Sequence, residues 1–179
     1  MYHCTFFWER NGYKLSMRHI ISILLENEAG ALSRVSGLFS ARAYNIESLT
    51  VAPTDDSTIS RITVVAHGEE DVVEQIMKQL NKLVDVIKLI DLTENDHFER
   101  EIMLIKIEPT GSQLDSMDSV IEDIGAKKLE TKDDIITLEV TDNGLRLNEV
   151  IEKLIPFNVL EVVRSGAVGI SSGHSLLKI

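Results

Sequence analysis

The sequence predicts an α+β protein of two small domains that repeat one order of elements. Stretches rich in β-branched residues alternate with stretches whose apolar residues recur at three- and four-residue spacing, which indicates strands and amphipathic helices. The order strand-helix-strand-strand-helix-strand occurs twice. The length of 179 residues fits one ordinary domain or two small ones, and the repeat favours two.

In the first copy, a strand over residues 20–25 and a polar break at 26–30 precede a helix-length segment with one apolar face. Two β-branched runs follow at 46–51 and 59–66, separated by the turn-forming sequence Pro53-Thr54-Asp55-Asp56. A second helix and a strand complete the copy; the helix is marked by Val72, Val73, Ile76, Met77 and Leu80, and the strand by residues 84–89.

The second copy begins with a strand over residues 102–107 and a helix carrying Leu114, Met117, Ile121 and Ile124. Its remaining elements are strands near 128–131 and 135–140, a helix around Val150 to Ile155, and a strand at 159–163. This repeat predicts two ferredoxin-like βαββαβ domains in tandem, each a four-stranded antiparallel sheet covered by two helices. We expect the divisions 1–16 (leader or tag), 17–92 (first domain), 93–99 (linker), 100–173 (second domain) and 174–179 (tail).

Residues 1–16 differ from the rest in composition, since they hold the only Trp, the only Cys and two of the three Tyr. We interpret them as a leader or tag that does not belong to the domains, with Met17 as the true initiator. The alternative is an N-terminal arm that packs on a neighbour. No signal peptide is expected, because the apolar stretch is short and follows no Lys or Arg.

Composition limits the partners and the compartment. The formal net charge of −11 disfavours nucleic acid and anionic membranes, and no apolar run approaches the roughly 20 residues that span a bilayer. The single cysteine, Cys4, excludes an internal disulfide and fits a reducing compartment, so we expect a cytoplasmic protein. Open sheet faces and short edge strands of two small domains predict a homodimer.

The most informative segment is LENEAGAL at residues 25–32, where a strand passes into a helix through a turn with Asn27 and Gly30. The start of a helix offers free N–H groups to a carboxylate, a glycine permits close approach, and an amide both donates and accepts. These groups suit a small amino acid, and Asn45 is a further amide before the second strand. The alternative reading makes both asparagines turn residues and Gly30 a helix-entry residue.

Other candidates are weaker. Gly166, Gly169 and Gly173 precede no predicted helix, so a flexible tail is favoured over a phosphate loop. His97, with nearby Asp91, Asp96 and Glu99, lacks the spacing of metal ligands, so a solvated linker is favoured over a metal site. The residues show no catalytic constellation.

Four segments carry a resemblance to a known family: LENEAGALSRV, then YNIESLTVAPT, the ERE of residues 99–101 and the terminal RSGAVGISSG. Together they resemble the acetolactate synthase small subunits, also called acetohydroxyacid synthase regulatory subunits. The resemblance covers residues 17–173. It implies an N-terminal ACT domain that binds amino acids and a second domain of related topology. It also implies that the chain is not itself an enzyme, but activates a separate catalytic large subunit and makes it sensitive to valine. Thiamine diphosphate, Mg and FAD are then expected only in that partner, with no cofactor or metal in this chain.

The resemblance also implies an effector site for valine or another branched-chain amino acid. Its residues are Asn27, Gly30, Ala31, Leu32, Asn45 and Ile46. In ACT pairs the effector lies between two domains, so the loop of one subunit is expected to face Asn45 and Ile46 of the other. The alternative function is a free-standing ACT-domain sensor that acts on another partner.

Overall fold

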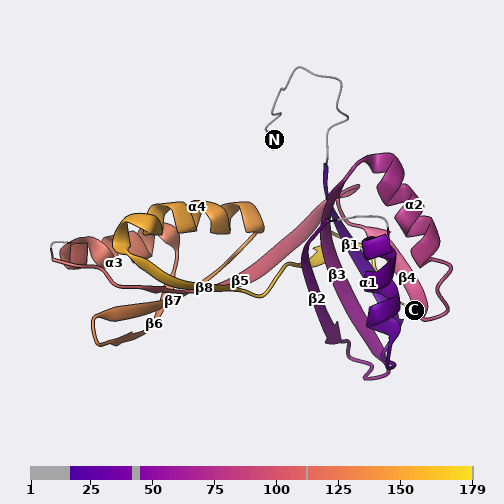
Figure 1. Cartoon of the computed structure of the whole chain (residues 1–179), viewed down its shortest axis with the longest axis horizontal. Helices are drawn as coiled ribbons and strands as arrows, with labels where there is room; N and C mark the ends of the chain where they lie inside the picture. The colour runs from indigo at the N-terminus through magenta and orange to yellow at the C-terminus, as the bar shows by residue number, and fades with distance from the viewer. Residues whose placement is uncertain (1–16, 42–44, 112, 179) are drawn as a thin grey trace, which may run out of the picture.

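The computed structural model describes residues 17–41, 45–111 and 113–178. The predicted leader, residues 1–16, therefore lies outside the described residues. The described part of the chain forms two sheets, each with two helices on one face (Figure 1).

The first domain has a four-stranded antiparallel sheet in the order β2-β3-β1-β4. Its elements are β1 (Met17–Glu26), α1 (Ala31–Ala41), β2 (Asn45–Pro53), β3 (Ile59–Gly68), α2 (Glu70–Leu80) and β4 (Val86–Asp91). The strand predicted at 84–89 begins two residues later, because the backbone N–H of Val86 donates to the carbonyl of Leu83 in a turn.

The second domain repeats this plan with the strand order β6-β7-β5-β8. Its elements are β5 (His97–Ile107), α3 (Gln113–Ile124), β6 (Lys127–Lys132), β7 (Ile135–Asp142), α4 (Gly144–Leu154), a 3-10 turn η1 (Ile155–Phe157), β8 (Val159–Arg164) and β9 (Val168–Ser171). The predicted fold class, two ferredoxin-like βαββαβ domains in tandem, is confirmed.

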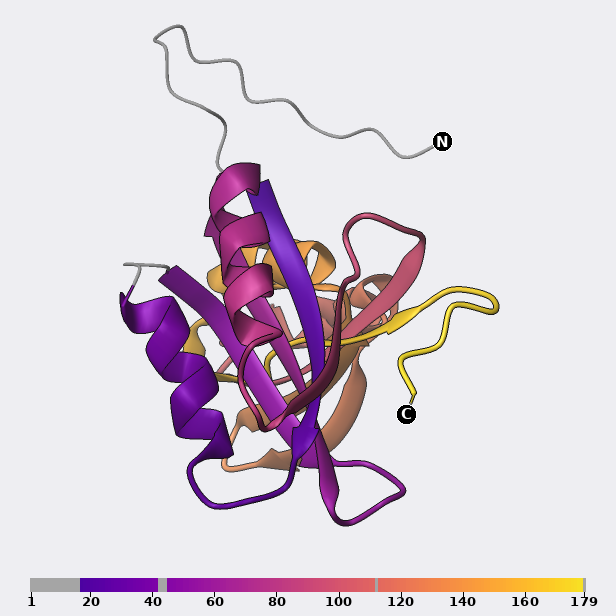
Figure 2. The same cartoon turned by 90° about the vertical axis from the view of Figure 1, so that its right-hand side faces the viewer.

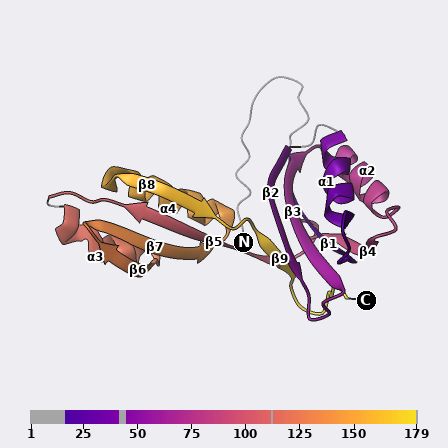
Figure 3. The same ribbon diagram turned by 60° about the horizontal axis from the view of Figure 1, so that its bottom comes forward.

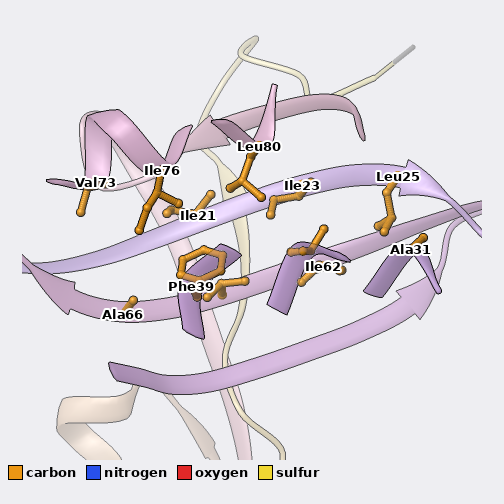
Figure 4. Packing of buried hydrophobic residues seen from close by; sticks show 12 residues of the cluster. Ile21, Ile23, Leu25, Ala31, Phe39, Ile62, Ala66, Val73, Ile76 and Leu80 are labelled. Carbon is orange, nitrogen blue, oxygen red and sulfur yellow. The ribbon is translucent and has the colours of Figure 1, made fainter. Parts of the chain in front are cut away.

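Each sheet buries one face against its own helices. In the first domain, Phe39 of α1 and Ile76 of α2 pack on Ile21, Ile23 and Ile62 of the two central strands (Figure 4). Burial along β5 alternates from residue to residue, so that Met103, Ile105 and Ile107 face the helices of the second domain. This period of two is the signature of a strand with one covered face.

Two expectations about the segments around the second domain are wrong. The glycine-rich residues 166–171 are not a flexible tail, because Val168–Ser171 form β9, which pairs antiparallel with the first half of β5. For the same reason residues 97–99, assigned to the linker, lie in a strand. The predicted open face of the first sheet is also covered, since the β5–β9 ribbon lies on the side opposite α1 and α2 (Figure 3).

A small third core joins the two domains. Ile20 and Val65 of the first sheet pack with Leu92 and with Ala167 of the segment before β9, and all four are buried. Nearby, Arg61 donates from Nη2 to the carbonyl of Gly169 at 2.9 Å. The domains are therefore connected by packing as well as by the chain.

Candidate effector site

The predicted loop is fastened to the neighbouring turn between β2 and β3. The backbone N–H of Asn27 donates to the carbonyl of Thr58 at 2.7 Å, and its side-chain Nδ2 donates to the carbonyl of Ser57 at 2.9 Å. Among the described residues no donor approaches Asn27 Oδ1, and the residue is exposed. The loop therefore holds an amide in a fixed position with its oxygen open to a ligand.

Gly30 sits at the entry to α1 with a φ of +89°, a conformation that strongly favours glycine. A Cβ on Gly30 would lie 3.1 Å from Arg34 Nη1, so the guanidinium passes close over the glycine backbone. Gly30 thus allows both the sharp turn and the close approach of another group to the first turn of α1.

Arg34 places a positive charge beside this loop. Its Nε and Nη2 each donate to Asp85 at 2.6 Å, and the Asp85 side chain is only 5% exposed. The hydrogen bonds from Arg34 lower the pKa of the Asp85 carboxyl, although burial acts to raise it. The third nitrogen of Arg34, Nη1, is the one beside Gly30 and is directed towards the loop.

The predicted apolar residues differ in how much surface they can offer. Ala31 is 2% exposed as a whole residue, packs inside the first core and donates its backbone N–H to the carbonyl of Glu28 at 3.2 Å, so it offers no open surface to a ligand. Leu32 is 39% exposed, and Ile46 is half-buried at the edge of the same core. Leu32 and Ile46 therefore keep apolar surface that a branched side chain could cover.

The predicted site falls into two halves that one chain does not bring together. Asn27 and Gly30 precede α1, whereas Asn45 and Ile46 begin β2, which follows it. Figure 2 shows the end of β1 and the start of β2 at opposite ends of α1. The 11 residues of α1 rise about 16 Å at 1.5 Å per residue, which separates the two halves by roughly that distance. A ligand that touches both halves must lie between two chains.

The weaker candidates have structural partners. Asp91, considered for a metal with His97, is buried and bonded to Nδ1 of His19 at 2.8 Å. Glu99 is bonded to Arg18. Within the described ranges no group of three or more His, Cys, Asp or Glu side chains is placed to hold a metal.

None of the helices in the described part of the chain has the length and apolar character that crossing a bilayer requires.

The sequence did not predict the Arg34–Asp85 pair beside the loop, because its members are 51 residues apart in the chain.

The fold and the helix-entry loop define a tandem ACT-type protein, and comparison with known proteins narrows the class. Residues 21–88 match the family model described as the AHAS small subunit-like ACT domain, and residues 100–173 match that of the small subunit of acetolactate synthase. The chain belongs to the acetolactate synthase small-subunit family.

Named relatives agree over nearly the whole chain. The acetolactate synthase isozyme 3 small subunit of Escherichia coli is 46% identical over 90% of this chain and 100% of its own length. The small subunit of Bacillus subtilis is 39% identical over 88% of this chain and 92% of its own. The crystal structure of the small subunit from Thermotoga maritima superposes with a TM-score of 0.79 at 29% identity, covering 89% of this chain and 99% of that one.

Proposed function

We propose that this chain is the regulatory subunit of an acetolactate synthase in branched-chain amino-acid biosynthesis. It binds a separate thiamine-diphosphate-dependent large subunit, raises its activity and makes it sensitive to valine. The chain contributes no catalytic residue; thiamine diphosphate, Mg and FAD belong to the partner. The observation that carries the proposal is the split site, with Asn27 and Gly30 at one end of α1 and Asn45 at the other.

A homodimer through β2 would complete this site. β2 is an edge strand, so its outer backbone groups are free to pair with a second chain. In an antiparallel pair of β2 strands, the start of one strand at Asn45 lies beside the end of the other at Pro53. The loop of residues 27–30 is at that same end, because Asn27 is bonded to the turn that follows Pro53. The two halves of the site then meet across the two-fold axis.

Valine would use each group at this junction. Its carboxylate would meet the N–H groups of Leu32 and Ser33 in the first turn of α1, at the positive end of the helix dipole. The Nη1 of Arg34 would add positive charge, and Asn27 Oδ1 would accept from the ammonium group. Leu32 of one subunit and Ile46 of the other would cover the branched side chain. Because valine would touch both chains, it would favour one arrangement of the dimer.

Acetolactate formation by the cognate large subunit tests this function. The rate is measured with and without this chain, and then as valine is added. We expect the chain to raise the rate and valine to suppress it. Asn27→Ala and Asn45→Ala should keep the activation and lose the response to valine, while the exposed Asn95→Ala serves as a matched control and should keep both.

A different result separates the alternatives. If the chain binds valine by calorimetry but neither activates the large subunit nor makes it sensitive, a free-standing amino-acid sensor with another partner becomes the better account. If Asn27→Ala binds valine with unchanged affinity, the assignment of the loop is wrong.

A further inference from the structure

Strand β2 carries half of the proposed amino-acid site and also contacts the second domain. Glu47 directly follows Ile46, and its Oε2 accepts from Arg18 Nε at 3.3 Å and from His67 Nε2 at 2.7 Å. The remaining guanidinium nitrogens of Arg18 donate to Glu99 at 3.1 and 2.6 Å. Since Glu99 lies in β5, Arg18 connects the first residues of β2 to the second domain.

The Arg18–Glu99 pair is sheltered from solvent. The Glu99 side chain is 10% exposed and that of Arg18 is 27% exposed. Burial acts to lower the pKa of Arg18, but hydrogen bonds and attraction from Glu99 and Glu47 outweigh it and raise the pKa above its ordinary value. A bidentate, partly buried ion pair of this kind holds two groups in a fixed relative position better than an exposed ion pair does.

A second contact lies along the same strand. Thr50 Oγ1 donates to the carbonyl of Ser165 at 3.2 Å, and the backbone N–H of Ala167 donates to Ser48 Oγ at 3.4 Å. Gly166, between them, has a φ of +78°, and a Cβ there would lie 2.7 Å from Thr50 Oγ1. The turn from β8 to β9 therefore rests so closely on β2 that only glycine fits.

Glu101 fastens this turn to the second domain, and the tight contact of the turn with β2 lies at the side of a cavity. Glu101 accepts from Arg164 at 3.0 and 2.6 Å and from the backbone N–H of Gly166 at 3.1 Å. Beside it lies a cavity of about 330 Å³, lined by Glu47 and Leu49 of β2 and by Glu101 of the second domain. The polar contacts between β2 and the second domain therefore border open space, which gives the side chains at this contact room to shift.

We propose that β2 couples the amino-acid site to the second domain, an inference that rests on the proposed function. An amino acid held at Asn45 and Ile46 repositions the start of β2. Two contacts pass this change on, the chain from Glu47 through Arg18 to Glu99, and the contact of Thr50 with the turn of residues 165–167. The residues of these two contacts do not touch the amino acid. They determine whether its binding changes the conformation of the second domain.

Hydrogen exchange of the amides in residues 165–171, with and without valine, tests the coupling. It is measured in the wild-type chain and in two separate variants, Glu99→Gln and Thr50→Val. Thr50→Val keeps the branched shape of the side chain and replaces the hydroxyl by a methyl group, which cannot donate to Ser165, so it remains informative if Glu99→Gln weakens the fold. Glu161→Gln is the matched control, because it removes an exposed ion pair with Lys106 elsewhere in the second domain.

In the wild type and in the control, we expect valine to change the exchange of these amides. In each junction variant the change should be reduced, because one of the two contacts is removed. The valine affinity measured by calorimetry should stay within about twofold of wild type, since neither residue touches the ligand. In the acetolactate assay, the valine concentration needed for half-inhibition should rise at least about fivefold in these variants.

The outcomes distinguish the two proposals. Valine binding by the wild type with no change in exchange at residues 165–171 overturns the coupling alone. A junction variant that keeps the full change in exchange, or a control variant that loses this change, also overturns the coupling alone. A wild-type chain that binds no valine refutes the proposed site and the coupling together.

Discussion

Gly169→Ala should destabilise the junction between the domains. The added methyl carbon would lie 2.5 Å from Leu92 Cδ1 and 3.5 Å from Ile20 Cγ2, and both of these side chains are 1% exposed. Carbon atoms in good contact are about 3.5 to 4.0 Å apart, so the methyl overlaps Leu92 by roughly 1 Å. Because Leu92 is enclosed and cannot swing into solvent, we expect a loss of about 1 to 3 kcal/mol in the free energy of unfolding.

The clash can be assigned to Leu92 by a double-mutant cycle. Leu92→Ala alone should cost about 2 to 5 kcal/mol, because it leaves a cavity. In the double variant the new methyl occupies that space, so the combined loss should be smaller than the sum by more than about 0.5 kcal/mol. Urea unfolding followed by far-UV circular dichroism measures all four free energies.

Gly37→Ala is the matched control, since a Cβ on this residue of α1 meets no atom within 4 Å. It should raise stability by about 0.5 to 1 kcal/mol. A Gly169→Ala variant as stable as wild type, or one whose effect adds to that of Leu92→Ala without interaction, would refute the predicted clash.

Two further predictions concern the loop. Hydrogen bonds from Arg34 lower the pKa of Asp85 in the folded chain, so this pair stabilises the fold fully above the unfolded pKa of about 4 and loses its effect as the pH falls through the lower folded pKa. The stability difference between wild type and Asp85→Asn, measured by urea unfolding, should therefore be constant near neutral pH and shrink below about pH 4; a difference that is the same at every pH would contradict this. Gly30→Asp should weaken valine binding in calorimetry more than about tenfold, because it places a negative charge where the carboxylate binds. Gly30→Ala has the same strained backbone without the charge and should weaken binding less; equal losses in both variants would show that the carboxylate lies elsewhere.

The domain fold could be predicted from the sequence because its signals are local. The β-branched run around Ile21 and Ile23 and the spacing of Val35 and Phe39 each specify one element and its buried face. β9 gave no such signal. Gly166 before β9 and Gly169 within it suggest a loop. The structure shows instead that they lie against Thr50 and Leu92, which are distant in sequence.

The site could be predicted only in part. Residue types singled out Asn27, Gly30 and Asn45, and the family resemblance added their common role. The structure adds that α1 separates them. The ion pairs around them could not be predicted, because Arg34 and Asp85 are 51 residues apart in the sequence and Arg18 and Glu99 are 81 apart. At such separations each charged residue has many possible partners of opposite charge, and the sequence does not distinguish among them.

The most direct test of a valine site shared between two chains is calorimetry on a crossed heterodimer. One chain carries Asn27→Ala and the other Asn45→Ala, and two different tags allow the mixed dimer to be purified. One of its two sites then has both changes, while the other has an intact loop and an intact Asn45. The account predicts one valine per crossed dimer, two per wild-type dimer and none for either variant alone; a crossed dimer that binds no valine while the wild type binds it would show that each site lies within one chain.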